Sequence, residues 1–391
     1  MLNFSNPIIS YFFESSFSFT DSINIQKIKL KENNFYQVES MLNNKKDNIM
    51  DISSYPFKKI KNKIKRNVTY DEYGRLFLNG ELFFPLNIGT YAAREEDLKL
   101  INQSHFNIIH PFFNIERKKM DRIDSLYQGR VKVINPLNFT AFTFPEPNAI
   151  AYKEEIYKKD IVDKVNELKD HPALFAWYVN DERFSFYHKD IRNMTLTIHE
   201  LDPNHPSYSV IMPFGEMPTL LNTTDLFGVD NYPIGGGEIR EITDLNGKES
   251  EEPLGKPYIP MMQIFDWHIS NGTKSGNLTP PTVQEMRNMC WQALALGARG
   301  FSFYSLFEIN LLDNITPIKD RWKDIVEITD QLWEYKDIIL SIDKVNKIKY
   351  VQNNNVTFRQ WKYNNSNYIA VNNLERRKEI FKIDLLDKYE I

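Results

Sequence analysis

Two adjacent carboxylates end an apolar segment in the middle of this chain. In HPALFAWYVNDERFSF (171–186), the apolar run from Ala173 to Val179 has the composition of a buried strand and is followed by Asn180, Asp181 and Glu182. Such carboxyl groups are either solvated surface charges or, in parallel α/β proteins, part of a site at the carboxyl ends of the strands. The ends of the other strands decide between these alternatives.

Polar and aromatic side chains end most of the other apolar segments as well. The segments that have the composition of strands are 82–88, 106–113, 131–137, 173–179, 207–212, 226–232, 258–265 and 300–307. In or beside them lie the further candidate site residues Asn87, His110, Asn135, Trp177, Asp230, Tyr232, Gln263, Asp266, Trp267, Tyr304 and Glu308. Aromatic faces cover the C–H faces of sugar rings, and amide, imidazole and carboxylate groups bind hydroxyls directionally. The set therefore favours a carbohydrate site.

Carboxyl groups in such a site could cleave a glycosidic bond. One carboxyl must be protonated to release the leaving oxygen, and the other must be ionised to attack the sugar or to activate water. Two like charges held close together, one of them partly desolvated, separate their pKa values into these roles.

The order of the elements predicts the fold that brings these ends together. Helix-like segments separate most of the strands, and the clearest, PPTVQEMRNMCWQALALG (280–297), begins with a capping box of Thr282 and Glu285. Eight apolar strands that alternate with helices fit a (β/α)8 TIM barrel, which takes about 250 residues. A doubly wound sheet is the alternative, but no glycine-rich phosphate loop follows any strand.

The regions outside the barrel have a different pattern. Residues 1–65 predict an irregular or small β leader, 66–340 the barrel, and 341–391 a small β-sheet appendage. The Asn79-Gly80 pair between two apolar runs predicts a β-hairpin just before the barrel.

The chain resembles the (β/α)8 glycoside hydrolases related to the catalytic domains of β-galactosidases and β-glucuronidases, as an outlying branch. The segments that carry the resemblance are GRLFLNGELFFPLNIG (74–89), EEDLKLINQSHFNIIHPF (95–112), HPALFAWYVNDER (171–183), HELDPNHPSYSV (199–210), DLFGVDNYP (225–233) and MCWQALALGARGFSFYSL (289–306). The resemblance implies a fold, a glycosidase activity without a cofactor, and a carbohydrate substrate.

The resemblance also implies roles for individual residues. In that superfamily the fourth strand ends in Asn-Glu, with the Glu as acid/base; here one residue is interposed, in Asn180-Asp181-Glu182. Glu182 is therefore the expected general acid, and Asn180 an expected contact of a sugar hydroxyl. The family's nucleophilic Glu ends strand seven, but MMQIFDWH (261–268) contains no Glu. The eighth strand also lacks the tryptophan that is common at its end in the superfamily.

The missing glutamate leaves three candidates for the second carboxyl, ranked Asp266, Asp230 and Glu308. Asp266 lies on the expected strand, but its side chain is one methylene shorter than Glu. That shorter reach would lengthen the gap to Glu182 towards the roughly 6.5–9.5 Å of an inverting site. Two other functions remain open: a barrel that binds carbohydrate without cleaving it, and a metal-dependent hydrolase. Seven histidines are present, but no H-x-H or H-E-x-x-H pattern.

Bulk composition limits the partners and the compartment. The net charge of −4, with both signs mixed along the chain, gives no sign of a nucleic-acid footprint, and no apolar run is long enough for a membrane span. The single cysteine, Cys290, excludes an internal disulfide and is expected to be buried and inert. The oligomeric state is left open.

N-x-S/T triplets are unusually frequent. There are eleven, at Asn3, Asn67, Asn102, Asn138, Asn193, Asn222, Asn271, Asn277, Asn314, Asn355 and Asn364. A chain with 39 Asn and 38 Ser or Thr would contain about four by chance. The excess favours a glycosylated protein of the secretory or lysosomal route, although the N-terminus has no basic n-region and contains Glu14.

Overall fold

A computed structural model of the chain describes residues 35–43, 49–58, 66–137, 154–183, 187–211, 223–247, 256–267, 279–311, 317–345, 349–350 and 353–384. The chain divides into two compact units, residues 1–65 and 66–391. In the first unit, β1 (Phe35–Asn43) and β2 (Ile49–Lys58) form an antiparallel hairpin. The second unit contains everything discussed below.

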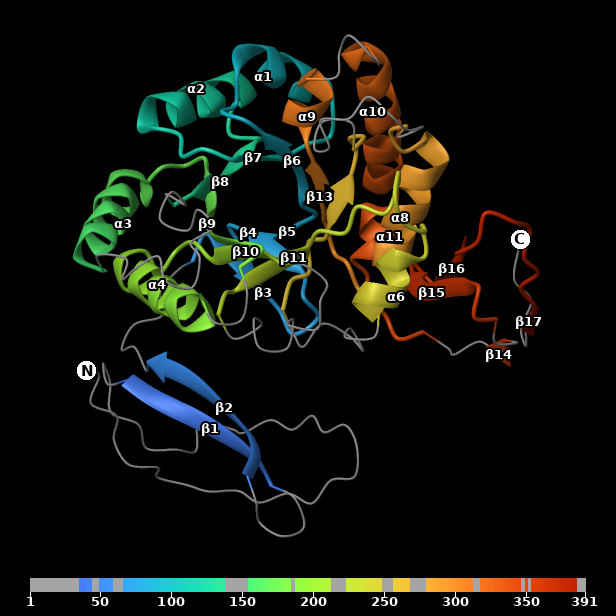
Figure 1. Cartoon of the computed structure of the whole chain (residues 1–391), viewed down its shortest axis with the longest axis horizontal. Coiled ribbons are helices and arrows are strands. Elements are labelled where there is room, and N and C mark those ends of the chain that lie inside the picture. The colour runs from blue at the N-terminus through green and yellow to red at the C-terminus, as the bar shows by residue number, and fades with distance from the viewer. Residues whose placement is uncertain are drawn as a thin grey trace. The chain divides into compact units, whose positions relative to one another are not determined.

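Eight parallel strands form a nearly closed barrel, which confirms the predicted fold class (Figure 1). They are β6 (Leu86–Thr90), β7 (Ile108–Pro111), β8 (Lys132–Pro136), β9 (Leu174–Asp181), β10 (Ser207–Ile211), β11 (Leu226–Val229), β12 (Met261–Gln263) and β13 (Phe301–Tyr304). Neighbours run in the order β11-β10-β9-β8-β7-β6-β13-β12. Two further parallel bridges, Phe227 with Tyr258 and Asp230 with Met261, join the ends of this sheet.

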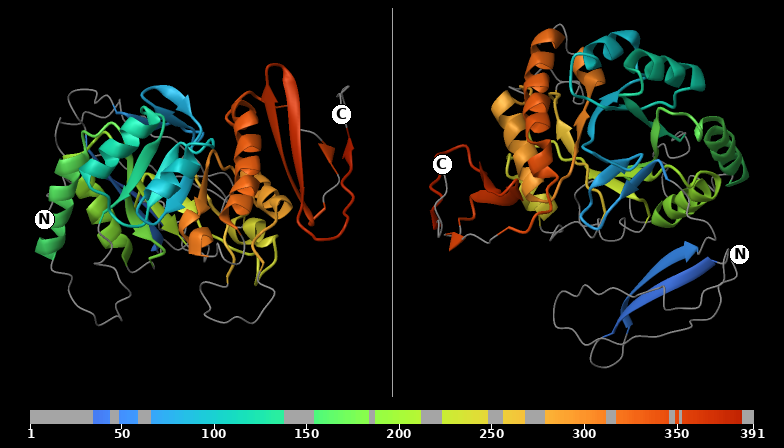
Figure 2. Two further views of the ribbon diagram at one scale, coloured as in Figure 1. Left: turned by 90° about the horizontal axis from the view of Figure 1, so that it is seen from above. Right: turned by 180° about the vertical axis from the view of Figure 1, so that it is seen from behind.

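Helices surround the barrel because every strand buries one face inside it and the other against the helices (Figures 1 and 2). They are α1 (Glu95–Ile101), α2 (Arg117–Tyr127), α3 (Glu154–Leu168), α4 (His188–Leu201), α6 (Glu241–Gly247), α8 (Val283–Ala295), α9 (Leu306–Leu311), α10 (Ile318–Glu334) and α11 (Lys336–Ile339). The predicted capping box of α8 is present, with the Thr282 hydroxyl accepting from the Glu285 N–H. Within the described ranges, every helix is too short or too polar to cross a lipid bilayer.

The amino-terminal end of the barrel is covered by a three-stranded sheet of β3 (Val68–Tyr70), β4 (Leu76–Leu78) and β5 (Glu81–Phe83). The predicted turn joins β4 to β5, with Asn79 and Gly80 both at positive φ. The predicted first strand, 82–88, is in fact two elements, because Pro85 has no N–H to continue a ladder. Val68 and Leu76 pack into the barrel's own core against Ile108.

A small β appendage packs on α8. Its strands are β14 (Lys349–Tyr350), β15 (Val356–Tyr363), β16 (Ser366–Asn373) and β17 (Ile383–Asp384). The ring of Trp361 lies 6.3 Å from that of Trp291, and the Arg359 guanidinium donates to the Leu294 carbonyl. Cys290, on the same helix, is buried, and burial raises the pKa of its thiol.

Candidate functional site

Two carboxyl groups meet at the carboxyl ends of the barrel strands. Glu182 follows β9 and Asp230 follows β11, and their side chains share a hydrogen bond. Both backbones are held by β10, because the Glu182 N–H donates to the Val210 carbonyl and the Asp230 N–H to the Ile211 carbonyl. Glu182 has a φ of 50°, a left-handed conformation that a non-glycine residue adopts at a cost and that is frequent at functional sites.

The environment of Asp230 favours its protonated form. Burial raises the pKa of Asp230 well above its usual range, and the hydrogen bond and charge of Glu182 add to the shift, as does the charge of Asp181. Asp230 is buried, whereas Glu182 is exposed.

Asp181 lies at the end of β9, next to Glu182, and is exposed. Desolvation raises its pKa, against a hydrogen bond from Tyr178 that lowers it. The Tyr178 hydroxyl donates to Asp181 Oδ1 at 2.7 Å and so fixes this carboxylate beside Glu182.

Aromatic rings line the same end of the barrel. The ring of Tyr304 lies 5.4 Å from that of Tyr232 and 5.2 Å from that of Phe112. The charges of Glu182 and Asp181 contribute to raising the pKa values of both Tyr232 and Tyr304, so these hydroxyls lie near the carboxyl pair. Tyr304, Tyr232 and Phe112 form a wall of rings next to the acidic groups.

His110 lies below this wall, fully buried. Its ring is 4.2 Å from that of Tyr178 and 5.9 Å from that of Tyr208. Neither ring nitrogen has a hydrogen-bond partner among the described residues, and burial lowers the pKa of His110 to about 3. The imidazole is therefore neutral, with hydrogen-bonding capacity that these protein groups do not use.

Several other buried polar atoms share this property. In the described part of the chain, such atoms include Asn87 Oδ1 and Ser209 Oγ, within strands β6 and β10, and Asp230 Oδ1 and Asn231 Nδ2, just past the carboxyl end of β11. Asn87 does use its amide group, which donates to Ser302 Oγ at 2.8 Å. Unpaired buried polar atoms cost free energy, so Asp230 and Asn231 favour a polar ligand at the carboxyl end of the barrel.

Glu308, in α9, contacts the ring wall through Tyr304. It accepts a hydrogen bond from the Ser305 hydroxyl and another from Tyr304. Burial raises the pKa of Glu308 to about 7, so its carboxyl changes charge near neutral pH.

Asp266 and Gln263 are engaged elsewhere. Asp266 is buried near Arg321 of α10. Burial lowers the pKa of the Arg321 guanidinium, and the charges of Asp324 and Asp266 oppose this shift. The guanidinium donates to the carbonyls of Ile264 and Pro281. Gln263 bonds the N–H and the carbonyl of Ile234 and the carbonyl of Phe265. Both side chains thus help to hold the loops around β12.

Four more predicted site residues also make structural contacts. The amide of Asn180 donates to the Val210 carbonyl, and the Trp267 indole to the Tyr232 carbonyl. Asn135 bonds the backbone of Ile115. Trp177 lies in the outer core and donates to Asp202 Oδ2 at 2.8 Å, so it faces the helices rather than the barrel interior.

Sequence reasoning missed Tyr178 and Tyr208, which lie inside the barrel. Tyr178 neighbours Trp177, and alternation places the two on opposite faces of β9. The position of the Tyr208 ring requires a glycine at residue 228. A Cβ on Gly228 would lie 2.6 Å from the tyrosine hydroxyl and 2.4 Å from the Ile259 carbonyl oxygen. Strict alternation counted back from Asp230 could have identified this glycine as inward-facing.

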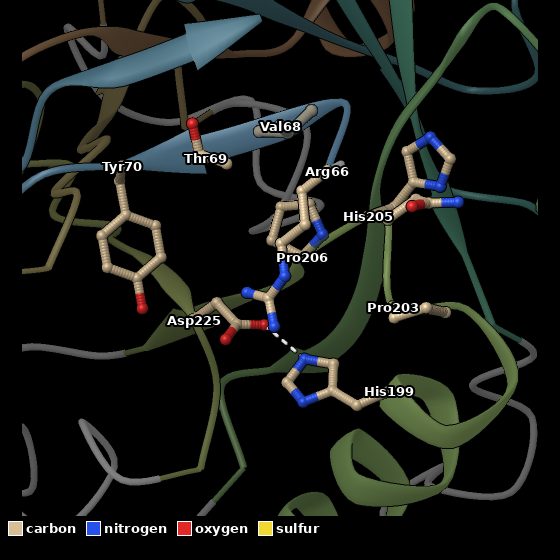
Figure 3. A pocket seen from close by; sticks show the side chains of 10 residues that line it. Arg66, Val68, Thr69, Tyr70, His199, Pro203, His205, Pro206 and Asp225 are labelled. Carbon is tan, nitrogen blue, oxygen red and sulfur yellow. Dashed lines mark hydrogen bonds and ion pairs between the residues drawn. The ribbon is translucent and has the colours of Figure 1, made fainter. Parts of the chain in front are cut away.

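A pocket of about 150 Å³ lies at the other end of the barrel (Figure 3). His199 Nε2 contacts Asp225 Oδ2 at 2.7 Å, and the N–H and hydroxyl of Ser207 donate to the same oxygen. Burial alone would raise the pKa of Asp225, but His199 and these hydrogen bonds hold it below its usual range. The polar groups are satisfied by one another, which is typical of the stabilising end of a barrel.

The fold is distantly similar to solved glycosidase structures, as the sequence resemblance predicted. One is a β-glucuronidase 2 of Bacteroides uniformis, 14% identical with a TM-score of 0.47, which covers 69% of this chain and 36% of its own. A glycosyl hydrolase family 2 member from Bacteroides cellulosilyticus is 14% identical, with a TM-score of 0.44 and coverages of 69% and 33%. A β-glucuronidase from Ruminococcus gnavus is 10% identical, with a TM-score of 0.45 and coverages of 69% and 49%.

The likeness is distant. This chain spans about a third to a half of the length of those proteins. No family model and no curated protein matches the sequence. Identities and TM-scores at this level do not bear on activity, which has to be argued from the residues of the site.

Proposed function

We propose that the barrel hydrolyses O-glycosidic bonds in a β-linked oligosaccharide or glycan, with Glu182 as general acid/base and Asp230 as the second carboxyl. The hydrogen bond between these two side chains carries the proposal. It joins an exposed carboxyl to a buried one whose pKa is raised, beside a wall of aromatic rings. Asp230 takes the place that the sequence ranking gave to Asp266, because Asp266 lies beside Arg321.

The proposed reaction uses the exposure of Glu182. Its carboxyl, supplied with a proton through Asp230, protonates the leaving-group oxygen as the bond from that oxygen to the anomeric carbon breaks. Water delivers hydroxide to the anomeric carbon, and its proton returns to the carboxyl pair. The ring wall excludes water from the rest of the site, which strengthens the electrostatic effect of each charge.

Substrate has to separate the two carboxyls. Retaining sites hold them about 5–5.5 Å apart and inverting sites about 6.5–9.5 Å, whereas hydrogen-bonded carboxyls are closer than either. Since Asp230 is buried and Glu182 lies at the solvent-exposed end of β9, Glu182 is the side chain that moves when a sugar ring enters.

Carbohydrate binding without cleavage is the second candidate. It is favoured by Gln263, which lies at the end of β12, where the resemblance implies a carboxylate. The amide of Gln263 is hydrogen-bonded to the loop backbone.

A panel of 4-nitrophenyl β-glycosides, with and without EDTA, tests the alternatives. We expect turnover of at least one glycoside that EDTA does not reduce. Calorimetric binding of β-linked oligosaccharides without turnover would support the binding role, and loss of turnover with EDTA a metal-dependent hydrolase.

A further inference from the structure

Three aromatic rings form an exposed cluster next to the proposed site. Tyr91 is 41% and Phe113 52% exposed, and Phe307 is half-buried. The ring of Tyr91 lies 4.6 Å from that of Phe113 and 4.7 Å from that of Phe307. These three residues are called the outer platform below. Large exposed rings that gather in one place, rather than singly, are typical of binding surfaces.

The outer platform lies at the same end of the barrel as Glu182. Tyr91 follows β6, Phe113 follows β7, and Phe307 lies in α9, just after β13. These three strands are neighbours in the sheet (Figure 1). The Phe113 N–H also donates to the Tyr91 carbonyl, which ties the first two rings together through the backbone.

The platform continues the ring wall outward. Phe112 is adjacent to Phe113, and its ring is 5.2 Å from that of Tyr304, whose hydroxyl lies near Glu182. Gly89 allows this packing, because a Cβ there would lie 3.0 Å from Ser305 Cβ and 3.2 Å from the ring of Phe112. The ring wall beside the carboxyl pair and the exposed platform are therefore joined through the backbone, at Phe112 and Phe113 after β7.

The chemistry of the platform fits a sugar ring. A pyranose presents C–H groups to an aromatic face and hydroxyls at its edge. Arg94, which follows Tyr91 in the chain by three residues, is half-exposed and forms ion pairs with Glu96 and Asp97. Because the platform adjoins the proposed cleavage site, the occupant that suits it is another part of the same substrate.

We propose that the outer platform is a subsite for a second sugar ring, which makes the substrate an oligosaccharide longer than the two units that flank the cleaved bond. This inference rests on the proposed function, since Glu182 defines where the chain is cut. It predicts that the enzyme prefers extended β-linked chains to aryl monosaccharides.

Single substitutions Tyr91→Ala and Phe113→Ala test the subsite, with Tyr73→Ala as the matched control. Tyr73 is 49% exposed and lies between β3 and β4, at the opposite end of the barrel. The probes are the β-1,4-linked tetrasaccharides of glucose, galactose and N-acetylglucosamine, and the 4-nitrophenyl monosaccharides. Calorimetry on the inactive Glu182→Gln background measures binding independently of turnover.

For the tetrasaccharide that binds best, we expect each platform variant to weaken binding about fivefold, which corresponds to about 1 kcal/mol. Monosaccharide turnover and the Tyr73→Ala control should be unchanged. Weakened tetrasaccharide binding without any turnover would retain the subsite and remove the proposed hydrolysis. Turnover with equal tetrasaccharide binding in all variants, or no tetrasaccharide binding at millimolar concentration, would overturn the subsite. So would sedimentation showing a dimer that Tyr91→Ala dissociates, since the platform would then bind a second copy.

Discussion

The carboxyl groups of Glu182 and Asp230, which follow the two strands on either side of β10, share a hydrogen bond, and Asp230 is buried while Glu182 is exposed to solvent. Because the two side chains contact each other, removing either one changes the surroundings of the other.

This relationship predicts non-additive substitutions. We expect Glu182→Gln and Asp230→Asn each to lower kcat about 100-fold or more, because each removes the shared proton or its carrier. The double variant should lose little beyond the worse single variant, since the two residues act as a unit. Kinetics of the four proteins on one disaccharide, whose leaving group needs protonation, measure this. Losses that multiply in the double variant would mean that the two carboxyls act independently.

His110 predicts a dependence of stability on acid. Its folded pKa of about 3 is below its ordinary value, so the unfolded chain takes up a proton between pH 6.5 and 3 that the folded chain does not. The stability is complete above pH 6.5 and is lost as the pH falls, by about 2 kcal/mol at pH 5.

Urea denaturation at pH 7 and pH 5 tests this assignment on the wild type and His110→Phe, a ring that suits the surrounding tyrosines. The free energy of unfolding of His110→Phe should not show this decrease between pH 7 and pH 5. The control His105→Phe, at an exposed position, should still show it. An equal acid loss in all three proteins would show that His110 is not held neutral.

Glu308 predicts that stability changes with pH in the opposite direction. Its folded pKa of about 7 lies above the ordinary 4.5, so its contribution to stability is complete below pH 4.5 and is lost as the pH rises towards 7. The loss is about 3 kcal/mol in order of magnitude. Denaturation of Glu308→Gln between pH 4.5 and 7.5 should lack this decline, and the exposed Glu116→Gln should retain it. A decline that survives in Glu308→Gln would refute the shift.

Glycosylation is proposed from the eleven triplets. Among those that the structure describes, Asn67, Asn102, Asn193 and Asn364 are exposed and Asn355 is half-buried; Asn271 and Asn277 lie outside the described residues. Expression through a eukaryotic secretory route should give a protein whose mass falls on treatment with an N-glycosidase. The least used site should be Asn102, which caps the end of α1. An unchanged mass would remove the argument for the secretory or lysosomal route.

The sequence predicted the barrel well because the patterns that indicate its strands and helices involve residues close together in the chain. Apolar runs separated by helices and a capping box at Thr282 depend on residues close together in the chain, and all eight strands formed near their predicted positions. The exception was the first strand, where Pro85 separates the hairpin strand from the barrel strand.

The candidate site was harder to predict because it depends on which face of a strand each side chain occupies and on contacts between residues far apart in the chain. To choose between Trp177 and Tyr178, one must know which of them faces the barrel interior. The pairing of β9 shifts register with both neighbouring strands, so the sequence alone does not give this face. The sequence ranking placed Asp266 first without its neighbour Arg321, because Arg321 belongs to α10 and is far from Asp266 in the chain. The contact between Asp230 and Glu182 likewise depends on loops after two different strands.

The dependence of turnover on the leaving group tests the central role of Glu182 most directly. Wild type, Glu182→Gln and the exposed control Glu81→Gln, from the opposite end of the barrel, would be compared on two substrates with the same sugar. One releases 4-nitrophenol, which needs little protonation, and the other releases a second sugar, which needs much. The account predicts that Glu182→Gln reduces kcat/KM far more for the disaccharide than for the aryl glycoside, whereas Glu81→Gln affects neither. Equal reductions on both substrates, or none, would contradict Glu182 as the proton donor.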